Sequence, residues 1–512
     1  MAFKDFFRNL ARLPKTFSES FIRHDKPTSE RARSQTVMSN IFLHIHSTRI
    51  HRYTLKKTFT FGLGVIAASC FFILTVTGIL LMVYYKPSVD LAYDSIKDIQ
   101  HVVPSGRFIR NVHYWATNVM IVGVILHMCR VFYTAAYKGT RPFNWLMGVV
   151  LFILTLGLSF TGYLLPWDQL AYWAVTICSN IAASPREVTD LLGITTFFDP
   201  GGLMKVLLLG SEEIGQDALT RFFWLHSIVL PFLMFIVLSV HVWRVRKDGG
   251  LARPDNIKDK DMKGIEDDEK TKHVFENAPQ KTYGLMCLVK GNSPLVGRGP
   301  ESTIPSWPNL FIAEFALFMF TFAVVCVLAY FFNAPLKEIA NAAVPENPAK
   351  APWYFLGLQE LVSYSAFMGG VGIPTIALLG LALIPYLDRE KQTLGRWFDN
   401  RTGRRIALYS FLYAAGVTSA LLAFTVTFGW LRNWYPDISQ VVIILINPGT
   451  VLVTLFVAWS FYCLYKYDST RLSAIALFTC FIVSFVILTY FATFHRGPNW
   501  GFYWSKSQWP IH

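Results

Sequence analysis

Long runs of apolar residues, separated by short polar segments, dominate the pattern of this chain. A helix needs about 20 apolar residues to cross the hydrocarbon core of a bilayer. Nine runs approach or exceed that length, at residues 61–85, 113–137, 145–165, 222–243, 309–332, 371–387, 406–431, 441–465 and 473–494. The pattern therefore predicts an all-α integral membrane protein with about nine transmembrane helices, of which the sixth is the shortest.

The predicted spans fall into two groups. Four spans precede a long polar connection, rich in Lys, Asp, Glu, Gly and Pro, that runs from Asp248 to Pro308, and five spans follow it. We interpret this connection as a linker between two membrane modules. The predicted domains are an N-terminal segment 1–50, a four-helix module 51–248, a linker 249–308, a second module 309–434, and further helices with a tail 435–512.

Composition and charge support this picture. The chain has 512 residues, of which 53% are hydrophobic and 16% charged, with a net charge of +14. This balance excludes a soluble enzyme with one anchor. The basic clusters lie in Lys4–Lys57, Arg130–Arg141, Arg244–Arg253 and Arg389–Arg405. Each cluster precedes the first span or follows an even-numbered one, so the positive-inside rule predicts a cytoplasmic N-terminus and an outer C-terminus. The charge thus reflects topology, and we expect no nucleic-acid partner.

The segment before the first span mixes charges with apolar residues such as Phe3, Phe6 and Phe7. This pattern is typical of a short amphipathic helix on the inner leaflet, and a disordered basic tail is the alternative. His44, His46 and His51 follow in the same segment, where we expect them to be solvated.

Histidines recur within two spans at nearly the same spacing. His113 and His127 lie fourteen residues apart in the second span, and His226 and His241 lie fifteen apart in the fourth. In a helix, fourteen residues place two side chains about 21 Å apart along the axis and within about 40° of one face. Because the second and fourth spans run in the same direction, His113 stands level with His226 toward the outside. His127 then stands level with His241 toward the cytoplasm.

Two level pairs of imidazoles inside a helix bundle suit a planar metal cofactor. Ionisable side chains within a membrane span are costly and are taken as functional. Haem iron accepts two axial histidines, and a six-coordinate haem offers no open position for oxygen, so such a site transfers electrons. None of the seven cysteines lies in a CxxCH motif, so no attached c-type haem is indicated. The pattern predicts a four-helix bundle around two b-type haems, one per histidine pair.

Glycines and arginines accompany the histidines. Gly64 and Gly78 in the first span, and Gly148 and Gly162 in the third, repeat the fourteen-residue spacing. A porphyrin edge needs a missing side chain where it meets a helix, and small-residue helix packing is the alternative reading.

Three arginines, Arg110, Arg130 and Arg244, each lie three residues beyond a histidine toward the membrane edge. We expect these cations to bind the anionic haem propionates. For Arg130 and Arg244, ordinary positive-inside charge is the alternative.

Residues 50–248 resemble the cytochrome b subunit of the cytochrome bc complexes. The matching segments read TVTGILLMVYYKPS, RNVHYWATNVMIVGVILHMCRVF, FTGYLLPWDQLAYWAV and LTRFFWLHSIVLPF. The spacing in the fourth span resembles the chloroplast-like branch of that family. The stretch from PNLFIAEFALFMFTF to about Trp434 resembles a part that this branch carries as a separate subunit, so the chain resembles a fused form. The spans 441–494 lie beyond the resemblance.

The resemblance implies a proton-translocating quinol:cytochrome c oxidoreductase in a bacterial inner membrane. Quinol is oxidised at the outer side, and one electron passes to a Rieske iron–sulfur protein and a c-type cytochrome. The other electron passes through the outer haem and the inner haem to quinone at the cytoplasmic side. A homodimeric complex is also implied. The chloroplast-like branch attaches a third haem through a cysteine early in the first span, where this chain has Gly62, so we expect no covalent third haem.

The predicted quinol pocket departs from the family pattern. The family carries Pro-Glu-Trp-Tyr, whereas this chain reads KAPWYFLGLQELV, with Trp353 and Tyr354 matching and Pro352 in place of the glutamate. Quinol oxidation needs a nearby proton acceptor. We expect Glu360 to fill that role, because a helix would place it about 10 Å from Trp353 on the same face. Glu346 or a group on a partner subunit is the alternative.

An inner quinone site is predicted where the fourth span ends. Arg246, Lys247 and Asp248 lie there in the stretch WRVRKDGG, and they offer cations and a carboxylate near the inner haem. Positive-inside charge at a helix end is the alternative.

Two other functions fit the histidines. One is a dihaem membrane anchor subunit of a different quinone-linked dehydrogenase or reductase, although such anchors lack GYLLPWDQ and the PWY pocket. The other is a transporter with proton-relay histidines, which would bind no haem.

Overall fold

The computed structural model describes residues 11–12, 14–15, 27–40, 43–254, 257, 303–390 and 394–510. Within these residues, nine helices are long and apolar enough to cross a membrane. They are α4 (Leu63–Met82), α6 (Gly106–Tyr133), α7 (Pro142–Tyr163), the continuous run Gln216–Lys247, α14 (Ser306–Phe331), the run Met368–Leu387, the run Arg401–Trp434, α20 (Pro448–Tyr467) and α21 (Thr470–Phe494). The predicted fold class, an all-α multi-pass membrane protein, is confirmed.

Three of these runs consist of more than one helix or helical turn. Gln216–Lys247 consists of α11 (Gln216–Trp224), the π-helical turn η3 (Leu225–Val229) and α12 (Leu230–Lys247). Met368–Leu387 consists of a π-helical turn, η6 (Met368–Gly372), followed by α16 (Ile373–Leu387). Arg401–Trp434 divides into α17 (Arg401–Phe428) and α18 (Leu431–Trp434). The π-helical turns are local insertions of one residue, which often mark functional positions.

Shorter helices precede the first span or lie between the spans. They are α2 (Glu30–Ser39), α3 (Lys57–Thr60), α5 (Ala92–His101), α8 (Gln169–Ala183), α9 (Arg186–Leu191), α10 (Pro200–Leu209), α15 (Trp353–Val362) and α19 (Gln440–Leu445). The predicted span 441–465 therefore began too early. Asn447 breaks that run, because its side chain caps a new helix through the Thr450 backbone N–H, at 3.0 Å, and Pro448 occupies the first helical position.

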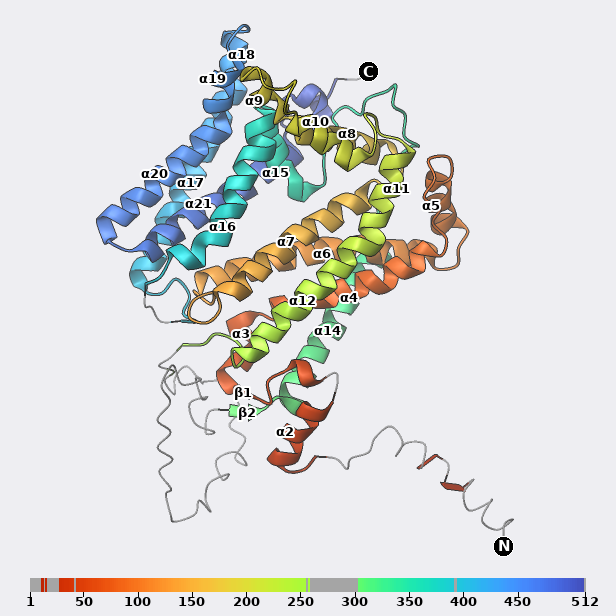
Figure 1. The fold of residues 1–512 in the computed structure, drawn as a ribbon, viewed down its shortest axis with the longest axis vertical. Helices are drawn as coiled ribbons and strands as arrows, with labels where there is room; N and C mark the ends of the chain where they lie inside the picture. The colour runs from red at the N-terminus through yellow and green to blue at the C-terminus, as the bar shows by residue number, and fades with distance from the viewer. Residues whose placement is uncertain are drawn as a thin grey trace. The chain divides into compact units, whose positions relative to one another are not determined.

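The described residues form two compact units. The larger contains residues 62–244, 252–256 and 318–512, and the smaller contains described parts of 1–61, 245–251 and 257–317. In the larger unit, α4, α6 and α7 lie side by side with the α11–α12 run (Figure 1). The helix α21 packs against α15, α17 and α20 in the same unit. About half of the predicted N-terminal segment 1–50 and most of the linker 249–308 lie outside the described residues, and the predicted domain boundaries stay a prediction.

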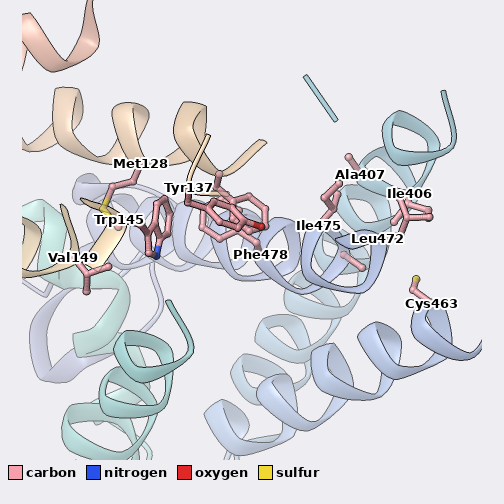
Figure 2. Packing of buried hydrophobic residues seen from close by; sticks show 12 residues of the cluster. Met128, Tyr137, Trp145, Val149, Ile406, Ala407, Cys463, Leu472, Ile475 and Phe478 are labelled. Atoms are coloured by element: carbon pink, nitrogen blue, oxygen red, sulfur yellow. The ribbon is translucent and has the colours of Figure 1, made fainter. Parts of the chain in front are cut away.

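The largest core cluster of the larger unit joins both groups of helices. It contains Met128 and Phe132 of α6, Tyr137 of the connection between α6 and α7, Trp145 and Val149 of α7, Ile406 and Ala407 of α17, Cys463 of α20, and Leu472, Ile475, Ala476 and Phe478 of α21. Figure 2 shows Tyr137 beside Phe478 in this cluster. Four of these residues belong to α21, so the last helix is part of the core. Burial of their apolar surface stabilises the fold by about 25 cal/mol per Å².

The smaller unit contains a two-stranded antiparallel sheet, in which Ile50 of β1 (Arg49–His51) pairs with Ile304 of β2 (Thr303–Pro305). His46 was expected to be solvated, and this expectation is wrong. Its Nε2 lies 2.7 Å from the Glu314 carboxylate, and its side chain is 18% exposed. Burial lowers the pKa of His46, but the hydrogen bond and charge of Glu314 raise it more, so the pKa lies above its ordinary value.

Candidate functional site

The four predicted ligand histidines meet in two pairs. The ring centroids of His113 and His226 lie 6.2 Å apart with an interplanar angle of 68°. Those of His127 and His241 lie 6.5 Å apart at 76°. Each pair joins α6 to the α11–α12 run, as the predicted register requires. In each pair the two imidazoles face each other, as the spacing in the sequence predicted.

The separation of each pair fits one metal ion between the rings. A bond from an imidazole nitrogen to a metal is about 2 Å long, as in zinc sites, and the ring centre lies roughly 1 Å farther on. Two such ligands on opposite sides of one iron give a centroid separation of about 6 Å. The observed 6.2 and 6.5 Å match this value. The residues present therefore fit a bis-histidine haem at each level.

The outer histidines are oriented by hydrogen bonds at Nδ1. Nδ1 of His226 lies 3.0 Å from the Leu158 carbonyl oxygen, which can only accept a hydrogen bond. Nδ1 of His113 lies 2.9 Å from Oγ1 of Thr77, whose own hydroxyl donates to the Ile73 carbonyl at 2.8 Å. Both Nδ1 atoms are therefore donors, and each Nε2 keeps its lone pair for a metal.

A π-helical turn compensates for the unequal spacing of the histidines. In a regular α-helix, the fifteen-residue interval between His226 and His241 would displace the two rings by about 60° around the axis. The turn η3, Leu225–Val229, begins one residue before His226, and the Leu230 N–H donates to the Leu225 carbonyl across it. Because such a turn holds one additional residue, the interval behaves like the fourteen-residue interval on α6.

The four predicted glycines each face one of the histidines. A Cβ atom on Gly64 would lie 3.2 Å from Cε1 of His127, and one on Gly78 would lie 3.4 Å from Cε1 of His113. The corresponding distance from Gly148 to His241 is 3.8 Å. A Cβ on Gly162 would collide with the His226 ring, with Nδ1 at 2.9 Å. Each glycine thus leaves room for a histidine ring, and the predicted contact with a porphyrin edge stays a prediction.

The three predicted propionate-binding arginines differ in their surroundings. The guanidinium of Arg110 is buried and donates to the carbonyl oxygens of Ala334 at 3.0 Å and Pro335 at 2.5 Å. It therefore fastens the loop after α14 to the start of α6, a role that the sequence did not indicate. Arg130 is buried one helical turn beyond His127. Arg244 donates to the Thr140 carbonyl at 3.2 Å.

Trp353 and Tyr354 begin α15 and contact the histidine-bearing bundle. Nε1 of Trp353 donates to Oδ1 of Asn118 on α6 at 2.8 Å. Tyr354 is 8% exposed. Burial raises the pKa of its phenol, and a hydrogen bond with Ser159 on α7 offsets part of that rise. Since Asn118 follows His113 by five residues, the PWY motif lies beside the outer histidine pair.

Glu360 lies on the same helix as Trp353, as predicted, but its carboxylate is already paired. Nε of Arg496 donates to Oε2 at 2.9 Å and Nη2 donates to Oε1 at 2.5 Å. Nε1 of Trp500 and the Tyr364 hydroxyl donate to the same carboxylate at 3.0 and 3.2 Å. Its side chain is 0% exposed. Glu346, the alternative acceptor, forms an ion pair with Lys337. Neither carboxylate is therefore a free base in this structure.

The predicted inner-site residues lie at the end of α12, in the smaller unit. The Ser47 hydroxyl donates to the Arg246 carbonyl at 3.4 Å, and Nη2 of Arg246 lies 3.7 Å from Sδ of Met38. Lys247 ends α12 and Asp248 follows it. The structure thus brings the segment before the first span to the residues predicted for inner quinone binding.

Two functional features escaped the sequence analysis. Thr77 and Thr161 lie next to the His113 and His226 rings, with Oγ1 of Thr161 at 3.4 Å from Nδ1 of His226. The signal was present, because a Thr-Gly pair occurs in both glycine-bearing spans at the outer level. Arg496 was also missed, since it lies in the tail that follows the last span and no local pattern connects it to Glu360.

Comparisons with known proteins agree with this geometry. The family model for cytochrome b/b6/petB matches residues 50–249. Cytochrome b6 of Prochlorococcus marinus strain MIT 9303 is 40% identical over 187 residues, which are 36% of this chain and 80% of that protein. Cytochrome b6 of Synechococcus elongatus is 39% identical over 187 residues and 81% of its length is covered.

A solved structure extends the likeness in fold to nearly the whole chain. A chain of a hyperthermophilic respiratory Complex III matches with a TM-score of 0.57 and 22% identity, and the match covers 93% of this chain and 98% of that one. The two groups of helices therefore share one fold with that chain. Because the histidine-bearing part of the chain is 40% identical to cytochrome b6 over 80% of that protein's length, this chain belongs to the cytochrome b/b6 family.

Proposed function

We propose that the chain holds two b-type haems and conducts electrons between them across the membrane. His113 and His226 would hold the outer haem, and His127 and His241 the inner one. The observation that carries this proposal is the pair of ring separations, 6.2 and 6.5 Å, each suited to one bis-histidine iron. Bound haem supplies one-electron redox chemistry. The chain's own residues orient the ligands and keep water from them.

We propose that quinol is oxidised at the outer side, beside Trp353 and Tyr354. The Trp353 contact with Asn118 holds α15 against α6, close to the outer histidine pair. The buried Tyr354 phenol offers an apolar ring and a hydroxyl to a quinol. The proton acceptor we propose remains Glu360, although its ion pair with Arg496 would have to open before the carboxylate could take a proton.

We propose that quinone is reduced at the cytoplasmic side, near Arg246, Lys247 and Asp248. The two cations would attract a reduced quinone and the carboxylate would deliver protons. We further propose that Arg130 and Arg244 face the propionates of the inner haem, from positions beside its two ligands. Arg110 stays proposed as a propionate-binding residue of the outer haem, and its guanidinium also clamps the outer loop through the Ala334 and Pro335 carbonyls.

The complex that we propose is a proton-translocating quinol:cytochrome c oxidoreductase of a bacterial inner membrane. Its partners would be a Rieske iron–sulfur protein, a c-type cytochrome, a quinone, lipid and a second copy of the complex. The chain would have its N-terminus in the cytoplasm and its C-terminus outside. We propose no covalent third haem, because Gly62 carries no thiol and adopts a positive φ of 63° at the start of α4.

Purification of the intact complex from native membranes tests this function. We expect a reduced-minus-oxidised spectrum with two b-type haems per chain, co-purification of an iron–sulfur protein, and quinol-dependent reduction of a c-type cytochrome. A dihaem chain with a dehydrogenase or reductase partner and no Rieske protein would favour the anchor-subunit alternative. A chain without haem would favour the transporter and would refute the proposal.

Glycine substitutions should affect the two haems unequally. Gly162→Ala introduces a Cβ that collides with the His226 ring, so the ring must leave its place and the outer haem should be largely lost. Gly148→Ala meets the His241 ring at an ordinary 3.8 Å and should retain most of the inner haem. Haem content and spectra of the purified variants measure both effects.

A matched control for Gly162→Ala lies on the same helix. Gly157 of α7 faces Cδ1 of Leu230 at an ordinary 3.7 Å, so Gly157→Ala should keep both haems. Equal retention of the outer haem in Gly162→Ala and Gly157→Ala would contradict the assigned close packing.

A further inference from the structure

An arginine at the start of the last helix is completely buried. The Arg471 side chain is 0% exposed, although it lies in the first turn of α21. It belongs to the chain's final pair of spans, for which the family likeness in sequence supplies no role. Removing an arginine from water is costly unless every neighbouring group is well placed. The contacts of this side chain therefore indicate what it does.

Arg471 donates to the end of the histidine-bearing helix α6. Its Nη2 lies 2.7 Å from the Phe132 carbonyl oxygen and 3.2 Å from that of Tyr133. These are among the last carbonyl groups of α6, which lie beyond the regular hydrogen bonds of the helix. The backbone N–H groups of Ala135 and Phe398 also donate to these two oxygens, each at 2.9 Å. A cation is favourable at that end because the helix dipole is negative there. Arg471 thus caps α6 from another part of the chain.

A buried set of polar side chains holds the guanidinium in this position. Nη1 of Arg471 lies 2.8 Å from the Tyr137 hydroxyl, which donates to Oδ2 of Asp388 at 2.6 Å. Nζ of Lys138 donates to Oδ1 of Asp388 at 2.6 Å, and Asp388 Oδ2 lies 3.8 Å from Arg471 Nη1. The guanidinium also lies over the Phe132 ring, 4.9 Å from its centroid. The cap is therefore fixed from several sides.

Further contacts join α21 to the same end of α6. The Phe132 and Phe478 rings stack with centroids 3.9 Å apart, and the Tyr133 hydroxyl lies 3.0 Å from Oγ1 of Thr479. His127 precedes Phe132 by five residues, which is about 7.5 Å along a helix axis. The capped end of α6 and the inner ligand therefore belong to one rigid stretch of helix.

We propose that Arg471 is a positioning residue for the inner haem site. Through the last carbonyl groups of α6 it fixes the orientation of His127, and its charge stabilises the reduced form of the cofactor that His127 and His241 hold. This inference rests on the proposed dihaem function. It assigns to the last helix the task of bracing the inner ligand from the cytoplasmic end.

A redox titration of the intact complex tests the proposal, with Arg471→Gln and Arg471→Lys as variants. In Arg471→Gln, loss of the cation should lower the ratio of reduced to oxidised inner haem at a fixed potential by roughly threefold to tenfold. A tenfold change corresponds to about 59 mV for one electron. Arg471→Lys keeps the charge and should recover most of the ratio. The outer haem should titrate as in the wild type.

Ser460→Ala is the matched control for a loosened last helix. Its hydroxyl lies 2.7 Å from that of Ser473, so it joins α20 to α21 without touching α6. This variant should leave the ratio of reduced to oxidised inner haem, and the electron paramagnetic resonance signal of that haem, unchanged.

If Arg471→Gln retains the wild-type inner-haem ratio and signal, the proposal is overturned while the dihaem function stands. If Ser460→Ala moves the ratio as much as Arg471→Gln, the effect is one of general loosening and the proposal fails. Wild-type complex without two titrating haems would instead refute the proposed function itself.

Discussion

His127→Ala is expected to remove the inner haem and to leave the outer haem in place. The variant would lose one of the two proposed ligands of the inner iron, and alanine cannot replace a coordinating nitrogen. The outer ligands His113 and His226 keep their own orienting contacts with Thr77 and Leu158. Loss of the inner haem should therefore leave the outer haem in place. Quinol-dependent turnover should fall by two orders of magnitude or more.

Haem content, redox spectra and turnover of the purified complex measure this effect. His101→Ala is the control, because His101 is an exposed residue at the end of α5 and belongs to neither pair. It should keep both haems and wild-type turnover. Full occupancy of both haems in His127→Ala would show that the proposed pairing of ligands is wrong.

Glu360→Gln is expected to destabilise the chain strongly. The substitution leaves Arg496, whose side chain is 11% exposed, without its anionic partner. Removing one member of a buried ion pair costs about 3–5 kcal/mol, since the remaining charge stays desolvated. The measurement is the thermal midpoint at which the detergent-solubilised protein loses its haem spectrum.

A double variant separates this structural role from proton transfer. In Glu360→Gln with Arg496→Gln, no uncompensated charge remains, so we expect more than half of the lost stability to return. If Glu360 is also the proton acceptor, the stabilised double variant should still turn over at least about tenfold more slowly per haem-loaded chain. If turnover returns together with stability, Glu360 acts only through the ion pair. Attention would then move to Glu346 or to a partner subunit. Single and double variants of equal stability would refute the ion pair itself.

The apolar runs and the histidine spacing determined much of this fold. Periodicity and length identified nine spans, because a lipid environment imposes a minimum length on every membrane helix. The register of His113 with His226 also followed from the sequence, since parallel helices with similar spacing must bring their histidines to similar depths. The four glycines were recognised for the same reason. They share the period of the ligands, and their contact with a porphyrin edge stays a prediction.

Other features depended on contacts between distant segments. Arg110 and Glu360 were predicted as a propionate ligand and a general base, and Arg471 was not singled out, because the sequence gives their positions along a helix and not their partners. The partners of Arg110 and Glu360 lie 224 and 136 positions away. Only the packed structure decides whether a buried charge is available to a substrate or already neutralised.

The placement of His226 and His241 also depends partly on the sequence and partly on the tertiary structure. The sequence by itself determined that two histidines lie on one helix, near opposite leaflets, because rise per residue fixes depth. In a regular α-helix, the side chains of His226 and His241 would point about 60° apart around the helix axis. The π-helical turn at Leu225–Val229 removes that offset. Such a turn is rare in regular helices, and here η3 packs against α7. Helix depth was thus a property of the sequence, whereas the facing of the two imidazole pairs was decided by tertiary structure.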